Sequence, residues 1–351
     1  MPINLIHLFS GIGAFEKALE KMDADFNVVN YCEINKHASL AYSLIHNVPE
    51  FKNLGDITKV NEKELPKDID LVCYGFPCQD ISLAGNQRGL FNKDGSKTRS
   101  GLFFDALRII NEIKPKVAIA ENVKHLLSIK FADSFNLILD ELDKAGYNNY
   151  YFLTNAKDYG IPQRRERVFI ISIRKDIDIH TILDPFFISP IKSQGERILS
   201  DFLDKEWDKK YILSERILKH CIYKIPEDKD VLLIKCATRL GYQCAYEGDG
   251  VDIGSRCKYH RGTVQYQSVG TIMTSGNDRG VVYRNKETNR LEIRKLTPCE
   301  CIKLMGFEER DYQILRDSKI SESQIFHMAG NSIVVNVVYE ILNKLITEGI
   351  L

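Results

Sequence analysis

The 351-residue sequence lacks any hydrophobic run that approaches the roughly 20 residues a membrane-spanning helix needs. It also lacks net charge, since 48 basic residues balance 48 acidic ones. A zero total gives no bulk signal for a nucleic-acid partner, although a basic cleft can lie within a neutral chain. Internal repeats, a basic leader segment and a small-residue cleavage site are missing too. We therefore predict a globular, cytoplasmic protein with no membrane partner.

Cysteine pairs of the CxxC type are absent, although the chain contains nine cysteines. An odd number without paired spacing is typical of buried thiols in a reducing compartment. The one metal-like spacing is Cys257-Lys-Tyr-His260, and neither Cys244 nor Cys236 lies at a regular distance from it. We predict no metal site.

Six short β-rich runs alternate with four helical patterns between residues 3 and 175. The predicted strands are Ile3–Phe9, Asn27–Cys32, Ile69–Tyr74, Val117–Glu121, Tyr150–Asn155 and Arg167–Ile173. The predicted helices are Ala14–Lys21, Lys36–His46, Leu102–Glu112 and Ser134–Ala145. Strands separated by helices indicate an α/β fold with a mostly parallel sheet covered on both faces. The last two strands have no helix between them, so we expect them to pair antiparallel near the sheet edge.

The pattern changes from about Asp176, where proline, charged residues and tyrosine replace regular periodicity. Helical patterns return after Leu296, with a capping signature at Thr297-Pro298-Cys-Glu300. The apolar spacing of Ser332–Thr347 predicts a helix that packs back on the first domain. We therefore expect a catalytic and cofactor-binding domain at 1–178, a smaller irregular β-rich domain at 179–290, and a C-terminal return at 291–351 that completes the first domain.

A glycine-containing turn follows the first predicted strand, in Leu8-Phe-Ser-Gly-Ile-Gly13. Gly11 and Gly13 allow a ligand to approach the backbone ahead of a helix N-terminus. Glu33 ends the second strand about 20 residues later, where a carboxylate suits two ribose hydroxyls, and Asp56 follows the next segment. The third glycine of the dinucleotide fingerprint is missing, which disfavours a nicotinamide oxidoreductase and favours a smaller nucleoside cofactor such as S-adenosylmethionine. A tight turn and a helix-capping carboxylate remain as alternatives.

Three further polar groups follow predicted strands. Cys78 comes after Leu71–Tyr74 on a proline-containing loop, at the sheet edge where ligands bind in open α/β sheets; the alternative is a small buried thiol. Glu121 ends the strand that starts at Val117, and with Asn122 it is also compatible with a helix N-cap pair. Arg165 and Arg167 are two residues apart, so in an extended chain both guanidinium groups share one face and suit a phosphate or a carboxylate.

Seven sequence blocks, taken in order, resemble the DNA (cytosine-5)-methyltransferases of the bacterial restriction–modification type. The blocks are FSGIG, GFPCQ, TRSGLFFD, ENV, YGIPQRRERVF, RKLTPCECIKLMGF and GNSIVV. They cover both ends of the chain and leave only about 180–270 unmatched. The resemblance implies a Rossmann-like methyltransferase fold, S-adenosyl-L-methionine as cofactor and double-stranded DNA as substrate.

The resemblance identifies Cys78 as the nucleophile that adds to cytosine C6. This chemistry makes C5 nucleophilic toward a methyl donor, and it needs an acid that holds a proton at N3, which suits Glu121. Arg167 would lie at the base or its phosphate beside Cys78, with Arg165 supporting. Because the target atom is unreachable inside a duplex, the base must flip out.

The remaining site residues are carried over by the same resemblance. Those of the cofactor pocket are Phe9, Gly11, Gly13, Glu33, Ile34, Asp56, Ile57, Pro77, Leu102 and Asn331. Those expected to contact DNA are Gln79, Ser82, Gln163, Thr271 and Thr274. The segment from about 180 to 285 is placed where this family keeps its target-recognition domain, and its polar composition suits phosphates and base edges.

The expected protein is a monomer with two domains around a DNA cleft, and a cognate restriction endonuclease would act separately. Two alternatives share the fold. A tRNA-methylating enzyme would use the same catalytic blocks, but its distinctive Cys-Phe-Thr segment is missing here. An inactive regulator would keep the cofactor site, but Cys78, Glu121, Arg165 and Arg167 are all present.

Overall fold

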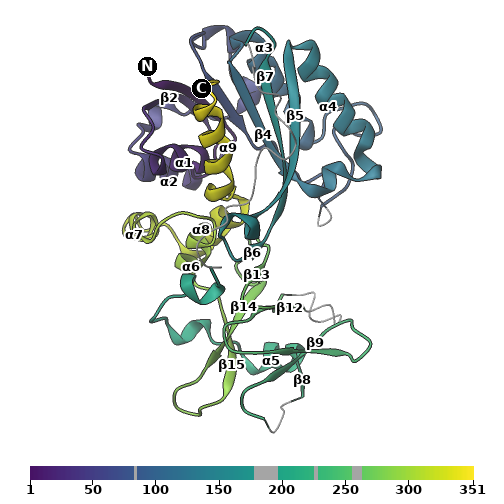
Figure 1. The fold of residues 1–351 in the computed structure, drawn as a ribbon, viewed down its shortest axis with the longest axis vertical. Helices are drawn as coiled ribbons and strands as arrows, with labels where there is room; N and C mark the ends of the chain where they lie inside the picture. Colours follow the sequence, from purple (N-terminus) through teal and green to yellow (C-terminus); the bar gives the residue numbers. More distant parts are fainter. Residues whose placement is uncertain (83–84, 178–196, 225–227, 255–262) are drawn as a thin grey trace. The chain divides into compact units, whose positions relative to one another are not determined.

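The computed structural model describes residues 1–82, 85–177, 197–224, 228–254 and 263–351 (Figure 1). Its contacts divide these residues into two compact units. Unit 1 contains 1–155, 166–177 and 335–351, and unit 2 contains 156–165 together with the described part of 197–334. The contacts therefore place 291–334 in unit 2, whereas the predicted C-terminal return begins at 291. The predicted functional boundaries near 178 and 290 stay predictions.

Unit 1 is built on a six-stranded sheet in the order β2-β1-β3-β4-β7-β5. Its strands are β1 (Ile3–Leu8), β2 (Phe26–Cys32), β3 (Leu71–Tyr74), β4 (Val117–Val123), β5 (Tyr147–Asn155) and β7 (Glu166–Arg174). The four strands β2, β1, β3 and β4 are parallel, and β7 pairs antiparallel with both β4 and β5. The mixed sheet and the antiparallel pair at its edge confirm the predicted fold class.

Helices cover both faces of this sheet. They are α1 (Ala14–Lys21), α2 (Lys36–His46), α3 (Phe103–Ile113), α4 (Ala132–Lys144) and α9 (Val335–Thr347). On one face, buried side chains of the strands such as Val72 and Ala118 pack in one core with α3 and α4. On the other face α1 packs against α9, and Figure 1 shows both beside α2. The predicted packing of the C-terminal helix on the first domain is confirmed.

The element limits follow local signals closely where those signals are strong. Helices α1 and α2 have the predicted bounds, and the Asn35 side chain caps α2 by accepting from two backbone N–H groups. Other bounds differ by one to three residues, and some elements are longer and others shorter than predicted. For example, β5 begins at Tyr147, since its pairing with β7 continues past the predicted start at Tyr150.

The described residues of unit 2 form three small sheets. These are β10-β9-β8 (Tyr242–Ala245, Leu232–Lys235, Ile222–Lys224), β12-β11-β14-β15 (Val264–Gln265, Gly250–Asp252, Arg279–Arg284, Leu291–Lys295) and β13-β6 (Val269–Gly270, Gln163–Arg164). Its helices are α5 (Glu215–Cys221), α6 (Pro298–Lys303), α7 (Glu309–Asp317) and α8 (Glu322–Asn331). The short strands confirm the predicted smaller β-rich part, while α6 to α8 add a helical part that the residues after Leu296 predict.

A buried ion pair joins β15 to α6 in unit 2. The guanidinium of Arg294 donates to both carboxylate oxygens of Glu300, at 2.9 and 2.7 Å. Glu300 also accepts from the backbone N–H of Thr297, whose hydroxyl accepts from the Glu300 N–H. This reciprocal arrangement is the predicted capping box, and it satisfies the buried charge from several sides.

No single helix in the described part of the chain is long and apolar enough to cross a membrane. The consecutive helices α8 and α9 meet the length and composition test only as a pair. The apolar face of α9, which includes Val338, Ile341 and Leu345, is buried within unit 1.

Candidate active site

The turn between β1 and α1 has an unusual backbone. Phe9, Gly11 and Gly13 all have positive φ angles, of 55°, 55° and 78°. Such a conformation is strained for a phenylalanine, and strain of this kind clusters at functional sites. Nothing lies within 4 Å of the position that a side chain on Gly11 would occupy. The residues Phe9–Gly13, hereafter the glycine loop, thus present an open backbone surface at the carboxyl end of β1.

Glu33 ties the end of β2 to the glycine loop. One carboxylate oxygen accepts from the Gly11 N–H at 2.9 Å, and the other accepts from the Asn35 N–H at 2.7 Å. The alternative that Glu33 caps the following helix is wrong, because Asn35 occupies that role. Next to Glu33, the Ile34 side chain is 72% exposed, which is unusual for a large apolar group and leaves it available to a ligand.

The third connection at this sheet edge brings Asp56 and Ile57 near the end of β2. The Asn53 amide oxygen accepts from the N–H groups of both Glu33 and Gly55, and the Cys32 thiol donates to the Gly55 carbonyl. Asp56 caps a short 3-10 turn through Thr58, and Ile57 is buried. Three predicted cofactor segments are therefore held together by direct hydrogen bonds.

The loop after β3 holds Cys78 in a fixed, half-exposed position. The Asn122 amide donates to the Phe76 carbonyl at 3.1 Å, and the Ser100 hydroxyl donates to the Pro77 carbonyl at 2.7 Å. The Cys78 carbonyl itself accepts from the N–H groups of Ile81 and Ser82. The alternative of a small buried thiol does not apply to Cys78, whose side chain is partly accessible. Leu102, at the end of a 3-10 turn that follows this loop, is also half-buried.

Most of the other cysteines in the described ranges are fully buried. Burial raises the pKa of Cys32 and of Cys299 to about 12, and it raises the pKa of Cys73 and Cys301 as well. These groups are therefore neutral thiols at physiological pH and poor nucleophiles. Cys244 is exposed but lies in unit 2, on β10. Cys78 is thus the cysteine placed for chemistry at the sheet edge.

Asp80 supports the Cys78 loop, and the sequence analysis did not single it out. Its side chain is fully buried. Its carboxylate accepts from the backbone N–H of Arg99 at 3.1 Å and from the Arg88 guanidinium at 3.0 Å. A signal was present, because an acidic residue two positions after the cysteine in a tight loop is a natural acceptor for loop N–H groups.

Replacing Asp80 with asparagine is expected to lower the free energy of unfolding by about 1–3 kcal/mol, because it removes a buried charged acceptor. Methyl transfer should fall as well, since the loop that holds Cys78 loosens. Denaturant unfolding and an initial-rate assay would measure the two effects. Asp94→Asn is the matched control, because Asp94 is exposed in the same connection and accepts from Ser96. Equal stability of the two variants would contradict the supporting role.

Glu121 and Arg167 form an ion pair across β4 and β7. The Arg167 Nε atom lies 2.9 Å from the Glu121 carboxylate, and the two side chains are 17% and 13% exposed. Both residues lie within strands, so the alternative of a helix cap at Glu121 and Asn122 is wrong. Because Asn122 binds the Phe76 carbonyl, the end of β4 and the Cys78 loop lie side by side.

Arg165 has different partners from Arg167. Its buried guanidinium donates to the backbone carbonyls of Ile272, Gly330 and Ser332, all within unit 2. Arg165 therefore connects its own segment to two others that are far away in the sequence, one at Ile272 and one at Gly330–Ser332. Arg165 lies between β6 and β7. The predicted pairing of Arg165 and Arg167 on one phosphate or carboxylate stays a prediction.

Two predicted site residues, Gln163 and Asn331, lie in unit 2. Gln163 is fully buried, and its amide binds the Leu304 carbonyl and the Ile272 N–H, so we assign it a structural role in place of the predicted DNA contact. Asn331 is the last residue of α8, which excludes the alternative of a helix N-cap. Its exposed amide lies 3.3 Å from the His327 ring.

The other predicted DNA contacts remain accessible. Gln79 is exposed and accepts from the Arg99 guanidinium, and Ser82 is half-buried. Thr274 is exposed, while the Thr271 hydroxyl donates to the Arg164 carbonyl.

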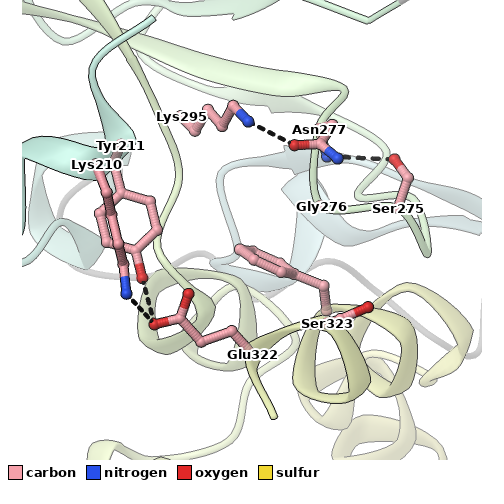
Figure 2. A pocket seen from close by; sticks show the side chains of 9 residues that line it. Lys210, Tyr211, Ser275, Gly276, Asn277, Lys295, Glu322 and Ser323 are labelled. Carbon is pink, nitrogen blue, oxygen red and sulfur yellow. Dashed lines mark hydrogen bonds and ion pairs between the residues drawn. The ribbon is translucent and has the colours of Figure 1, made fainter.

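A cavity of about 300 Å³ opens directly after Thr274. Its lining residues are Lys210, Tyr211, Ser275, Gly276, Asn277, Lys295, Glu322, Ser323 and Phe326. Figure 2 shows Lys210 and Tyr211 both reaching Glu322, at 2.6 and 2.9 Å. Lys295 instead binds the Asn277 amide oxygen at 2.6 Å, and because this partner is neutral the lysine charge is not cancelled by it.

Among the described residues, no group of three or more His, Cys, Asp or Glu side chains is close enough together to hold a metal ion. Cys257 and His260, which form the CxxH spacing, lie outside the described residues.

Comparisons with known proteins point to one family. The family model described as C-5 cytosine-specific DNA methylase matches residues 3–347. Type II methyltransferase M.HhaI of Haemophilus parahaemolyticus is 33% identical over 342 residues, which cover 95% of this chain and 91% of that protein. Orphan methyltransferase M.SPRI of Bacillus phage SPR is 28% identical over 435 residues, and the match covers 98% of this chain and 97% of that protein. The crystal structure of S. pombe Dnmt2 methyltransferase superimposes with a TM-score of 0.66 at 20% identity, covers 98% of this chain and 99% of that one, and supports the fold.

Proposed function

Because the chain belongs to the C-5 cytosine-specific DNA methylase family and is a DNA (cytosine-5-)-methyltransferase, we propose that Cys78 is its nucleophile and Glu121 its proton-holding group. One observation carries the assignment. The Asn122 amide binds the carbonyl of Phe76, two residues before Cys78. This contact brings the half-exposed thiol and the Glu121–Arg167 pair to the same edge of the sheet.

The glycine loop and its neighbours fit S-adenosyl-L-methionine. The open space at Gly11 and at Gly55 allows a ligand to approach both backbones. The exposed Ile34 side chain offers an apolar surface for adenine, and the adjacent Glu33 carboxylate is an acceptor for ribose hydroxyls. Phe9, Gly13, Asp56, Ile57, Pro77 and Leu102 would complete this pocket in unit 1, and the predicted cofactor contact of Asn331 stays a prediction.

The chemistry starts at the Cys78 sulfur. Its thiolate forms a bond to C6 of a cytosine flipped out of the duplex, and the electron pair of the C5–C6 double bond makes C5 nucleophilic. Glu121 holds a proton at N3 while the charge develops, and Arg167 fixes the Glu121 carboxylate. Bound S-adenosyl-L-methionine supplies the electrophilic methyl group. After a base removes the C5 proton, the sulfur–C6 bond breaks and the thiolate returns.

We assign DNA recognition to unit 2. Thr274 is exposed and lies next to the cavity that contains Lys295, whose charge would attract a DNA phosphate. Thr271 would act in the same segment, and Gln79 and Ser82 would contact the target strand from the Cys78 loop. We further propose that the enzyme is a cytoplasmic monomer that protects DNA from a separate restriction endonuclease, as the type II relatives suggest.

Bisulfite sequencing of plasmid DNA from cells that express the chain tests the proposed function. We expect protected cytosines in one short recurring context, and none with the Cys78→Ala variant. Unmodified DNA from a folded wild-type protein that binds S-adenosyl-L-methionine would overturn the DNA assignment and favour an RNA substrate.

Exchanging residues 179–290 for the corresponding segment of a relative should change the DNA sequence that is methylated, because the catalytic residues lie outside this segment. The same bisulfite assay reads the new context. An exchange of 132–144, which is α4, is the matched control and should leave the context unchanged. A chimera that is active at the original sequence would contradict the assignment of recognition to 179–290.

A further inference from the structure

A largely buried polar cluster lies behind the glycine loop, with the Glu20 side chain 26% exposed. It consists of His7 on β1, Glu16, Lys17 and Glu20 on α1, and Tyr42 and His46 on α2. We propose that His46 is a doubly protonated imidazolium that positions the Ile12 carbonyl of the glycine loop, and that cofactor binding therefore weakens at alkaline pH. The inference rests on the proposed function in one respect, namely that the glycine loop binds S-adenosyl-L-methionine.

The hydrogen bonds of His46 require two protons on the ring. The Nε2 atom lies 2.9 Å from the carbonyl oxygen of Ile12, and the Nδ1 atom lies 2.5 Å from a carboxylate oxygen of Glu20. A carbonyl and an ionised carboxylate can only accept. A neutral imidazole carries one N–H group and can satisfy only one of these partners. Both contacts are hydrogen bonds when His46 is charged.

The charges around His46 favour the same state. Glu16 and Glu20 approach it from α1, and Lys17 lies 3.5 Å from the second Glu20 oxygen. The negative charges of these two carboxylates favour a protonated His46. Tyr42, on the same helix as His46, contributes a ring contact at 5.0 Å.

Glu16 is itself held in the ionised form. It accepts from the Tyr42 hydroxyl at 2.7 Å and from the Nδ1 atom of His7 at 2.9 Å. Burial alone would raise its pKa, but the attraction and hydrogen bond of His7, with those of His46 and Tyr42, lower it. The pKa of Glu20 is also lowered, because the contacts with His46 and Lys17 outweigh burial. Neither carboxyl group is therefore available to donate a proton to His46.

The ring of His46 also sets the shape of the glycine loop. A side chain carbon on Gly13 would lie 2.2 Å from the His46 Nε2 atom, so the backbone and the ring are in close contact. On the other side of Ile12, the Gly11 N–H binds Glu33. The loop is thus fixed by His46 from the protein interior and by Glu33 from the ligand side.

The direction of the pH dependence follows from the pKa of His46. Burial alone would lower this pKa, but the hydrogen bond to Glu20, the charges of Glu16 and Glu20, and the bond to Ile12 raise it. Because this pKa is raised, the stabilisation of the glycine loop by protonated His46 is fully present below the ordinary pKa of histidine, about 6.5. It is lost as the pH rises through the raised value, where the ring gives up one of its two hydrogen bonds.

The first test is nitrogen-15 NMR of the full chain with labelled histidine, without any ligand. We expect both ring nitrogens of His46 to have the nitrogen-15 chemical shift of protonated nitrogen at pH 7. The signal is assigned to His46 because it disappears in the His46→Gln variant. A neutral tautomer at pH 7 would overturn the proposal. This measurement does not depend on whether the protein binds S-adenosyl-L-methionine.

The second test is a calorimetric titration with S-adenosyl-L-methionine across pH 6 to 10. We expect wild-type affinity to fall at alkaline pH, and His46→Gln to bind about tenfold more weakly at neutral pH, the size of a charge-assisted hydrogen bond. The fall in affinity that depends on His46 should be absent in the variant. Any change in affinity that comes from titration of S-adenosyl-L-methionine itself should remain in both proteins, so the variant serves as the reference. In the methylation assay the KM for the cofactor should rise more than kcat falls.

The exposed His37→Gln on α2 is the matched control and should behave as wild type. Identical pH profiles for wild type and His46→Gln would refute the positioning role. A wild-type protein that binds no S-adenosyl-L-methionine at any pH would instead remove the cofactor site, and with it the role of His46 there.

Discussion

Replacing Cys78 with alanine is expected to abolish methyl transfer, by roughly 10⁴-fold or more, because no other group can form the covalent bond to C6. Cofactor binding should persist, since the glycine loop, Glu33 and Ile34 lie on the connections after β1 and β2, whereas Cys78 lies on the connection after β3. Tritium transfer from labelled S-adenosyl-L-methionine to DNA measures the rate, and calorimetry measures the binding.

A covalent trap sharpens this experiment. In a 5-fluorocytosine duplex the C5 proton is replaced by fluorine, which a base cannot remove, so the Cys78–C6 bond should persist and survive denaturation. Wild type should form this adduct and Cys78→Ala should not. Cys244→Ala is the matched control, because it removes an exposed thiol from unit 2. Turnover near wild type in Cys78→Ala would rule out the nucleophile assignment.

Changing Glu121 to glutamine is expected to lower the methylation rate by roughly 10²- to 10⁴-fold, the range for a positioned acid. The amide has nearly the same shape but cannot hold a transferable proton at N3. It also removes the partner of the Arg167 guanidinium, which is only 17% exposed. Single-turnover kinetics at saturating DNA and cofactor separates this chemical effect from binding.

Glu166→Gln provides the control for Glu121→Gln. Glu166 also lies at the β4–β7 side of the sheet, where its carboxylate pairs with Lys124 at 2.7 Å and is 30% exposed. The same chemical change there should leave the rate near wild type. An undiminished single-turnover rate in Glu121→Gln would show that Glu121 only positions Arg167 and does not act as the acid.

The fold and much of the site could be predicted because their signals are local. The glycine loop, the proline before Cys78 and the capping box at Thr297 act within a few residues, and the capping box has the predicted geometry. Family membership is likewise readable from ordered blocks and is confirmed by the match to residues 3–347.

What could not be predicted depends on distant partners. Arg165 binds carbonyls more than 100 positions away, and Gln163 is buried against Leu304, so their spacing to Arg167 could not reveal their roles. The same holds for His46, whose protonation depends on a glutamate from another helix and on a loop carbonyl. Burial decided these cases, and burial is a property of the assembled fold.

Unit 1 is assembled from separate stretches of the chain, and α9 is the last of them to emerge from a translating ribosome. Until then the apolar surface of α1 that α9 covers has no partner. The residues of unit 2 must be synthesised before α9 can pack on that surface. Contacts between such distant segments slow folding, because the loop between them must be ordered first. A methyltransferase built this way gains its finished catalytic unit only after α9 has been synthesised, so the delay between the start of translation and the first methyl transfer is a property of the fold.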